Sequence, residues 1–377
     1  MSELNASNLR KEHGNEGPDL VGTTELTSPY YMVPPSGTTA ERPQNPQPGT
    51  LRFNTDIGSL EYFKGDTIGW ESINRTTPNL DGGARAINIG GAGPVNEMTY
   101  FTIATTGNAQ DFGDMATARY LHGSCSSRTR GLSGGGNIPE SNNIEYITIP
   151  SLGNGTSFGD LTSVKRNLQG GGNQTRGIFA GGLEPGPTYT DDIEYVTIAQ
   201  LGNSIDFGNL SVARIDSPTV SNGTRMVTFA GSVPSPTSGV NTMDYITIAS
   251  TGNATDFGDT LEVTDARAAS GCSATRGVFM GGRLQPSGTT VNTIQYITIA
   301  TLGNSTDFGD LTAAKRTGSG TSDKVRAVMI GGYNAGPSGN NVIEYIQIAT
   351  TGNALDFGDL PSNRYSFTSI SNAHGGI

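Results

Sequence analysis

Alternating apolar and polar residues recur along most of the chain and predict short β-strands. Around Tyr146, the residues Ile144, Tyr146 and Thr148 fall on one side of an extended strand, and Ile147 and Ile149 fall on the other. Apolar residues on both sides indicate a sheet that is covered on both faces, because a sheet with one solvated face alternates more cleanly. The pattern therefore predicts an all-β protein whose small sheets stack against one another.

The strand pattern belongs to a sequence repeat that occurs six times. One repeated string contains the tyrosines Tyr100, Tyr146, Tyr195, Tyr245, Tyr296 and Tyr345. About a dozen residues later each unit has an Asp-Phe-Gly-like string, with Phe112, Phe158, Phe207, Phe257, Phe308 and Phe357. Upstream of each tyrosine lies a strand that begins with arginine, and these arginines are Arg85, Arg130, Arg176, Arg225, Arg276 and Arg326. The span 84–377 therefore holds six units of about 49 residues each.

A period near 50 residues is typical of a four-stranded propeller blade, so residues 84–377 are predicted to form a six-bladed β-propeller. The first unit begins at Ala84 with the second strand of a blade, and its first strand is missing there. The segment 365–371 has the phase of a first strand. We therefore expect the C-terminal strand to pair into the first blade and close the ring, which removes two exposed sheet edges.

The repeat resembles the kelch type of propeller over about residues 84–377. The resemblance rests on a hydrophobic strand that ends in Gly-Gly and on a tyrosine about a dozen residues later, as in Gly281-Gly282 followed by Tyr296. The later tryptophan of kelch blades is absent, since Trp70 is the only tryptophan and lies outside the repeats. The phenylalanine of the Asp-Phe-Gly-like string is expected to fill its place.

The first 83 residues have a different pattern. Residues 1–50 are polar and rich in proline, so they are predicted to form an extended arm that orders on a partner. Residues 51–83 contain three short apolar segments, 51–55, 60–63 and 70–73, separated by Gly and Asp turns, and they predict a small β-meander with a linker. Three short strands are marginal alone, so oligomerisation or docking is expected to stabilise them.

A second resemblance covers about 45 of these residues. The segments Gly49–Thr55 and Leu60–Gly65, followed by Trp70, resemble a short module in structural proteins of tailed phages, and Met32–Pro43 is similar to leader segments in virion proteins of marine cyanobacterial phages. The resemblance implies a virion protein, present as a homo-oligomer or in many copies, that attaches to other virion proteins through residues 1–80. The residues expected to anchor it are Tyr30, Tyr31, Phe53, Tyr62 and Trp70.

Composition narrows the classes of function. The net charge of −11 disfavours a broad nucleic-acid-binding surface, and no apolar run approaches the 18 residues of a membrane span. Cys125 and Cys272 fall in opposite units, so they are predicted to be buried free thiols and not a disulfide. The three histidines show no metal spacing, and no catalytic motif is visible. We expect no metal, no cofactor and no membrane insertion.

Residues that recur in every unit are expected to be structural, because a catalytic site needs one set of groups in one place. The aspartates Asp111, Asp206, Asp256, Asp307 and Asp356 are predicted to hydrogen-bond their own turns. Beside the arginines that begin the second strands, a second series is Arg119, Arg166, Arg214, Arg267, Arg316 and Arg364. Both arginine series are expected to pair with these aspartates between blades, and the alternative is a cationic ring that binds an anionic glycan.

The connections between the Gly-Gly and the tyrosine of each unit differ in length and sequence. They are predicted to gather on one face of the ring, where variable loops on a rigid scaffold usually carry recognition. Tyr and Arg are enriched at interfaces, so they lead the candidates. The candidate binding residues are Glu140, Glu184, Tyr189, Pro234, Arg283 and Tyr333.

The resemblance to phage structural proteins implies a virion protein, and the lack of a visible catalytic motif leads us to expect that it is not an enzyme. Its N-terminus is attached to the tail, a fibre or a head appendage, and its propeller is displayed to bind a protein or a host cell-surface glycan or protein. One alternative is a capsid decoration protein or structural knob without receptor binding. Another is a glycan-active propeller enzyme, which would need a pair of carboxylates at the channel mouth.

Overall fold

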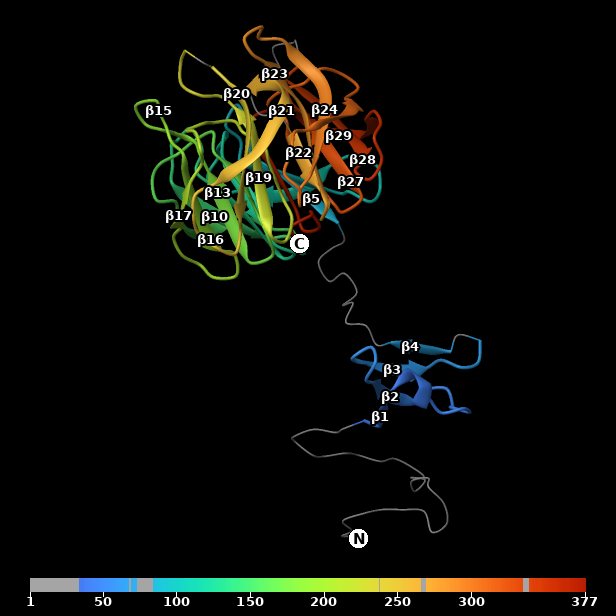
Figure 1. The fold of residues 1–377 in the computed structure, drawn as a ribbon. Coiled ribbons are helices and arrows are strands. Elements are labelled where there is room, and N and C mark those ends of the chain that lie inside the picture. The colour runs from blue at the N-terminus through green and yellow to red at the C-terminus, as the bar shows by residue number, and fades with distance from the viewer. Residues whose placement is uncertain (1–33, 68, 73–83, 237, 266–268, 335–338) are drawn as a thin grey trace, which may run out of the picture. The chain divides into compact units, whose positions relative to one another are not determined.

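The computed structural model describes residues 34–67, 69–72, 84–236, 238–265, 269–334 and 339–377. Within these residues the chain is all-β, as predicted, with thirty strands and one short 3₁₀ helix (Figure 1). Its contacts divide the chain into two compact units, Met1–Pro78 and Asn79–Ile377.

The larger unit consists of six repeats of four antiparallel strands, which we number I to VI. Repeat I contains β30 (Thr368–Ser371), β5 (Arg85–Ile89), β6 (Glu97–Thr102) and β7 (Gln110–Asp114). Repeat II contains β8 (Gly123–Ser126), β9 (Arg130–Gly134), β10 (Asn143–Thr148) and β11 (Thr156–Asp160). Repeat III contains β12 (Gln169–Gly172), β13 (Arg176–Ala180), β16 (Asp192–Thr197) and β17 (Ile205–Asn209), with the small hairpin of β14 (Leu183–Glu184) and β15 (Thr188–Tyr189) in one of its loops.

The other three repeats follow the same order. Repeat IV contains β18 (Thr219–Ser221), β19 (Arg225–Gly231), β20 (Val240–Thr247) and β21 (Thr255–Asp265). Repeat V contains β22 (Ala269–Cys272), β23 (Arg276–Leu284), β24 (Thr290–Thr298) and β25 (Thr306–Asp310). Repeat VI contains β26 (Ser319–Ser322), β27 (Arg326–Ile330), β28 (Asn340–Gln347) and β29 (Leu355–Arg364). Repeats IV and V join into one eight-stranded sheet because the end of β21 pairs with β23, and none of the described sheets closes on itself.

The first and last parts of the larger unit share one sheet. Strand β30 pairs antiparallel with β5, with Thr368 opposite Ile89 and Ser371 opposite Ala86. The backbone N–H of Arg85 also donates to the side-chain oxygen of Asn372 at 2.8 Å. The predicted pairing of the C-terminal strand with the first repeat is therefore confirmed.

Contacts between the repeats follow a cyclic order. The first strands β8, β12, β18, β22, β26 and β30 each contact the next, and β30 contacts β8. Six apolar clusters lie between successive repeats, and the last of them joins repeat VI to repeat I through Val328, Ile330, Phe101 and Phe367. The core is therefore divided among the seams between sheets, which explains the apolar residues on both sides of each strand.

Two repeated hydrogen bonds cross every seam. The arginine that begins each second strand donates to a backbone carbonyl of the next repeat at 2.8–3.3 Å, from Arg85 to Ile149 in repeat II round to Arg326 and Ile103 in repeat I. An asparagine in the loop after each third strand accepts from a backbone N–H of the preceding repeat at 2.9–3.1 Å, and these are Asn108, Asn154, Asn203, Asn253, Asn304 and Asn353. Each seam therefore has the same polar bonds.

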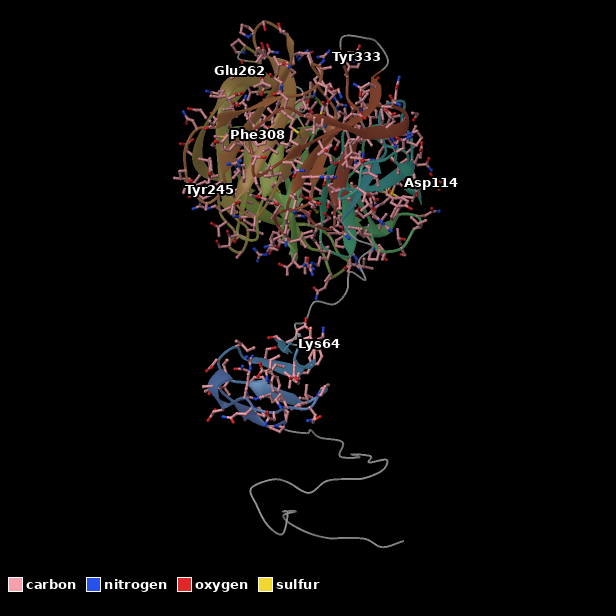
Figure 2. All side chains as sticks on the ribbon, turned by 90° about the vertical axis from the view of Figure 1, so that its right-hand side faces the viewer. Lys64, Asp114, Tyr245, Glu262, Phe308 and Tyr333 are labelled. Carbon is pink, nitrogen blue, oxygen red and sulfur yellow. The ribbon has the colours of Figure 1, made fainter. Side chains whose placement is uncertain are left out.

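The strand directions give the larger unit two distinct faces. We call hairpin face the end where the first and second strands are joined, as at 127–129, and where the chain enters at Arg85 and finishes after Ser371. We call loop face the opposite end, which carries the variable connections between second and third strands. Figure 1 shows the C-terminus and the start of β5 at the same end, and Figure 2 shows Tyr333 and Glu262 at the other.

The smaller unit is a four-stranded sheet of β1 (Ser36–Gly37), β2 (Leu51–Asn54), β3 (Ser59–Phe63) and β4 (Trp70–Ser72), with a 3₁₀ helix at Thr39–Glu41. The three predicted meander strands are present as β2, β3 and β4. Residues 34–50, which the sequence assigned to the extended arm, instead fold into this sheet, because β1 pairs with β2 and Arg42 binds the buried carboxylate of Glu61. Tyr30, Tyr31 and the predicted linker 73–83 lie outside the described residues.

Candidate functional site

The variable loops on the loop face are held by buried cations. Arg119 lies in the crossover that leads into repeat II, and its guanidinium donates to the carbonyl oxygens of Gly135 and Asn143 at 3.1 and 3.0 Å. These two residues flank the variable loop of repeat II. Arg119 also forms a buried ion pair with Glu145. One side chain therefore fixes both ends of the loop, and the carboxylate fixes that side chain.

Equivalent cations occur in other repeats. Arg214 pairs with Asp244 and donates to the carbonyls of Ala230 and Thr242 at 3.0 and 2.8 Å. Lys165 pairs with Glu194 at 3.0 Å, and Lys315 pairs with Glu344. Burial alone would lower the pKa of Lys165, but the carboxylates of Glu194 and Asp192 outweigh it and hold that pKa above its usual value. Burial of Arg119 and Arg214 lowers the pKa of each guanidinium, against the pull of its acidic partner.

Repeat V replaces this pair by a different one. Gln295 occupies the carboxylate position, and Asp265 occupies the position of the cation. Asp265 instead accepts two hydrogen bonds of 2.7 Å from Arg283, near the end of β23, and one of 2.5 Å from Gln285. Both residues of the pair differ from their counterparts in the other repeats, so no charge of repeat V is left buried without a partner at this position.

The predicted arginine series is therefore corrected. Arg119, Arg214 and Arg364 occupy the buried position, but Lys165 and Lys315 take it in repeats III and VI, one residue before Arg166 and Arg316. The sequence analysis missed both lysines because it aligned residues by type. The signal that identifies them is the carboxylate of the following third strand, which Gln295 lacks. Arg267 lies outside the described residues.

The arginines of the second strands are also not paired with aspartates. Each guanidinium lies 4.3–4.7 Å from the ring of the repeated tyrosine in its own repeat and bonds to the next repeat. The other side of each tyrosine packs edge-on against the repeated phenylalanine. Asp111 and its counterparts are exposed on the fourth strands and not in turns. The guanidinium groups of this series are therefore engaged in contacts within and between repeats, which argues against a cationic ring that binds an anionic glycan.

The six predicted binding residues all lie on the loop face, with Glu184, Tyr189 and Arg283 in strands and the others in loops, and the structure gives them different surroundings. Glu140 is exposed and pairs with Arg166, whereas Glu184 accepts a 2.5 Å hydrogen bond from Ser163. Tyr189 is half-buried in β15, and Pro234 is exposed. Arg283 is engaged by Asp265. The structure thus distributes these residues over repeats II to VI and does not gather them into one pocket.

Tyr333 belongs to an aromatic group that the sequence did not identify. Its ring lies 5.2 Å from the guanidinium of Arg316 and 5.6 Å from the ring of Tyr365. Tyr365 belongs to the crossover into repeat I, and Tyr120 occupies the same place in the next crossover, where Asn137 donates to its hydroxyl at 3.0 Å. All four of the aromatic and arginine side chains are half-buried. They form a rim of apolar rings with polar ends on repeats VI, I and II.

A row of strained, hydrogen-bonded crossover residues, which we call the circle, runs over five of the six repeats on the loop face, and the crossover into repeat V includes residues outside the described ones. Five crossover residues have φ between 52° and 59°, a region that favours glycine, and these are Leu121, Asn167, Asp216, Thr317 and Ser366. Backbone hydrogen bonds of 2.7–3.1 Å link Thr317 to Ser366, Ser366 to Leu121, Leu121 to Asn167 and Asn167 to Asp216. Such strain persists only where surrounding structure over-determines it, and it clusters at functional sites.

Beneath the circle lies a cavity of about 100 Å³ that is lined by the first strands of the repeats. Hydroxyl side chains line it because each first strand is a sheet edge with unpaired backbone groups. Ser126 donates to the carbonyl of Ser371 at 2.8 Å, Ser221 to that of Gly172 at 2.6 Å, and Ser322 to that of Cys272 at 2.8 Å. Cys125 and Cys272 are buried free thiols, as predicted.

The C-terminal residues cross the end of this cavity at the hairpin face. The ring of His374 donates from Nε2 to the carbonyl of Ser126 at 3.2 Å, because its Nδ1 accepts from the N–H of Gly376. Gly375 donates to the carbonyl of Cys272, in repeat V, at 3.1 Å. A Cβ on Gly375 would lie 2.1 Å from the backbone oxygen of Ser273, so only glycine fits there. Burial lowers the pKa of His374 to about 4, so its ring is neutral at pH 7.

The smaller unit has its polar side buried and its apolar side uncovered. Arg52, Asn54 and Glu61 point to the side that residues 34–48 cover, and Glu61 is fully buried between Arg42 and Arg52. Trp70 lies on this covered side, with both guanidinium groups within 6.0 Å of its ring. The other side of the sheet carries Leu51, Phe53, Leu60 and Tyr62, all partly or fully exposed. Two predicted anchors, Phe53 and Tyr62, are therefore accessible there, and Trp70 is half-buried on the opposite side.

The buried carboxylate predicts that acid destabilises the smaller unit. The hydrogen bonds from Arg42 lower the pKa of Glu61 below its ordinary value of 4.5. Its stabilising contribution is therefore fully present above about pH 4.5 and is lost as the pH falls through the folded-state pKa. Urea unfolding followed by the fluorescence of Trp70, the sole tryptophan, should show a lower midpoint at pH 3 than at pH 7. At pH 7 the free energy of unfolding of the Glu61→Gln variant should be about 1.5–3 kcal/mol below that of the wild type, and it should fall less between pH 7 and pH 3. An equal fall in both proteins would contradict this prediction.

No family model matches the chain, and the search of curated proteins found no match. Within the described residues, no helix is long and apolar enough to cross a membrane. The same residues contain no group of three or more His, Cys, Asp and Glu side chains that could hold a metal ion.

Proposed function

We propose that residues 84–377 form a six-bladed β-propeller of kelch-like type that serves as a rigid display scaffold. The cyclic order of contacts supports this architecture, since the seam between repeats VI and I has the same apolar cluster, arginine bond and asparagine bond as the other five. The pairing of β30 with β5 supports closure by the C-terminal strand.

We further propose that the protein is a non-enzymatic attachment protein of a tailed-phage particle. The observation that carries the proposal is the distribution of variation over the larger unit. Framework residues recur at every seam, whereas the loop face differs from repeat to repeat, and the chain enters at the opposite, hairpin face. A scaffold with its differences on one face and its covalent tether on the other suits display of a recognition surface. The virion setting comes from the resemblance of residues 32–70 to phage structural proteins.

The smaller unit is proposed to dock on another virion protein. Its uncovered side places Phe53 beside Leu60 and Leu51 beside Tyr62 across the β2–β3 pair. At the edge of this uncovered side, Lys64 and Glu71 form an ion pair, so their two charges offset each other. An apolar sheet face of this kind is stabilised when a partner covers it, and a small sheet that buries charged residues on its own needs that cover.

Three loop-face acids are engaged by other side chains, which supports binding over glycan cleavage. A glycosidase needs two carboxylates about 5–10 Å apart and open to a substrate. In the described part of the loop face, Glu140 pairs with Arg166, Asp265 with Arg283, and Glu184 accepts from Ser163. These carboxylates hold loops in place, which supports recognition without turnover.

Particles that carry variant chains test this function. The double variant Phe53→Ser and Tyr62→Ser should be absent from purified particles, because the docking surface is lost, while its larger unit melts normally. The double variant Tyr189→Ser and Tyr333→Ser should be incorporated at the normal level but reduce adsorption to host cells at least tenfold. Normal incorporation of the first variant would overturn the docking proposal. Normal adsorption of the second would favour a structural knob.

A further inference from the structure

The central cavity has a built interior, and the C-terminal residues cross one of its ends. All six repeats contribute their first strands to its lining. At the hairpin face, the C-terminal residues bond to Ser126 of repeat II and to Cys272 of repeat V, so they span the end of the cavity. At the loop face, the circle residues Leu121, Asn167, Asp216, Thr317 and Ser366 belong to the crossovers that lead into five of its lining strands. Any ligand therefore enters from the loop face.

The lining offers mainly hydrogen-bond acceptors. Its hydroxyl groups donate to backbone carbonyls of the neighbouring repeat, as Thr219 does to Gly170 at 2.6 Å and Ser270 to Thr219 at 2.7 Å. A hydroxyl group that donates its hydrogen in one hydrogen bond still has lone pairs that can accept another hydrogen bond. The exception is Gln169, at the loop-face end, whose buried amide Nε2 lines the cavity and has no partner among the described residues. A buried donor without a partner is costly, and a ligand oxygen would satisfy it.

The cavity contains no charged side chain. Its lining includes neither Asp, Glu, Lys nor Arg, and its one histidine, His374, is neutral at pH 7 and turned to its own backbone bonds. Moving an ion into such a site without a counter-charge is strongly unfavourable. The ligand group must therefore be polar, uncharged and able both to donate to the lining and to accept from Gln169.

We propose that this cavity binds the hydroxymethyl group of an uncharged hexopyranose, presented at the end of a glycan. The proposal rests on the proposed display function and names the ligand class of the same face. A hydroxymethyl oxygen accepts from the amide of Gln169 and donates to a serine or threonine oxygen. The cavity of about 100 Å³ has room for this group.

The remainder of the sugar lies against the aromatic rim. Tyr365 directly precedes Ser366, which is a member of the circle, and the ring of Tyr333 packs against the ring of Tyr365. Their half-buried rings offer apolar faces with polar ends, which suits the C–H faces and hydroxyls of a sugar ring. The crossovers into repeats I and II carry Tyr365 and Tyr120 where those into repeats III and VI carry Arg166 and Arg316, and Tyr333 packs beside Arg316 and Tyr365.

Matched sugars test the proposal on the full chain. Glucose, galactose and mannose are each compared by NMR saturation transfer and titration with the pentose that lacks the hydroxymethyl group and with the uronic acid that carries a carboxylate there. At least one hexose should bind saturably and at least tenfold more tightly than both of its counterparts. Absence of saturable hexose binding, or equal affinity within each set, would overturn the proposal.

Variants locate the binding site. Gln169→Leu and the isosteric Gln169→Glu should each weaken binding of that hexose at least fivefold, because both remove the amide donor. Gln200→Leu, an exposed glutamine in an outer loop of the hairpin face, is the matched control and should leave binding unchanged. Equal binding by the wild type and both well-folded Gln169 variants would also reject the site. If sugars fail to bind while adsorption still depends on Tyr189 and Tyr333, this inference fails and the display function stands.

Discussion

Deleting residues 365–377 should prevent the larger unit from folding. The deletion removes β30, the first strand of repeat I, and with it Phe367 and Ile370, which are 1% and 3% exposed and belong to two different seams. Truncating a buried phenylalanine or isoleucine alone costs about 2–5 kcal/mol each. The sum is comparable to the roughly 5–15 kcal/mol that stabilises a typical protein, before the lost strand pairing is counted.

Thermal unfolding followed by far-ultraviolet circular dichroism measures this effect. Deletion of residues 1–20, which belong to the other unit, is the control and should leave the main transition unchanged. The synthetic peptide 365–377, added to the deleted chain, should restore the transition in proportion to its concentration, since β30 joins the sheet without a covalent link to β5. Equal melting temperatures for the two truncations would show that the last strand does not close the repeats.

Removing the guanidinium of Arg214 should destabilise the larger unit by about 3–5 kcal/mol. The side chains of Arg214 and Asp244 are both fully buried, so Arg214→Met leaves a carboxylate without its counter-charge and frees the carbonyls of Ala230 and Thr242. The expected fall in melting temperature is on the order of 10 °C. The double variant Arg214→Met and Asp244→Leu should recover much of this loss, because no charge then remains buried.

A matched pair on the surface sets the scale of this experiment. Arg166 and Glu140 also form an ion pair, but both side chains are about one-third exposed, so Arg166→Met should change stability by less than about 1 kcal/mol. Repeat V supplies a natural precedent for the double variant, since it has Gln295 at the carboxylate position and no buried cation opposite it. Similar losses of stability for Arg214→Met and Arg166→Met would contradict the assignment of Arg214 as the side chain that holds both ends of its loop.

The strand order and the all-β class could be predicted because they depend on periodicity. The repeated Tyr and Phe fix the phase of the third and fourth strands, and Arg85 marks the second strand that lacks a first strand beside it. The buried cations that hold the ends of the variable loops could not be identified in the same way. In Lys165-Arg166 either cation could face inward, and only the structure shows that Lys165 pairs with the buried Glu194 whereas Arg166 pairs with Glu140 near the surface.

The cavity and the smaller unit were harder to predict for a different physical reason. The serines of the first strands look like solvated turn residues in the sequence, yet they line an interior because each satisfies a sheet edge of its neighbour. In β2 and β3 the usual assignment of apolar residues to the inside fails. Glu61 is buried because Arg42 and Arg52 neutralise it, and Phe53 and Tyr62 remain accessible.

The hydrogen bond between Arg85 and Asn372 bears on how the chain could be rearranged. In repeats II to VI a covalent hairpin occupies the place that these two residues occupy in repeat I. A circularly permuted gene that joins 372 to 85 and is cut at 127–129 would preserve every seam. The tether could then be moved to any of six equivalent positions on the hairpin face, each opposite the loop face.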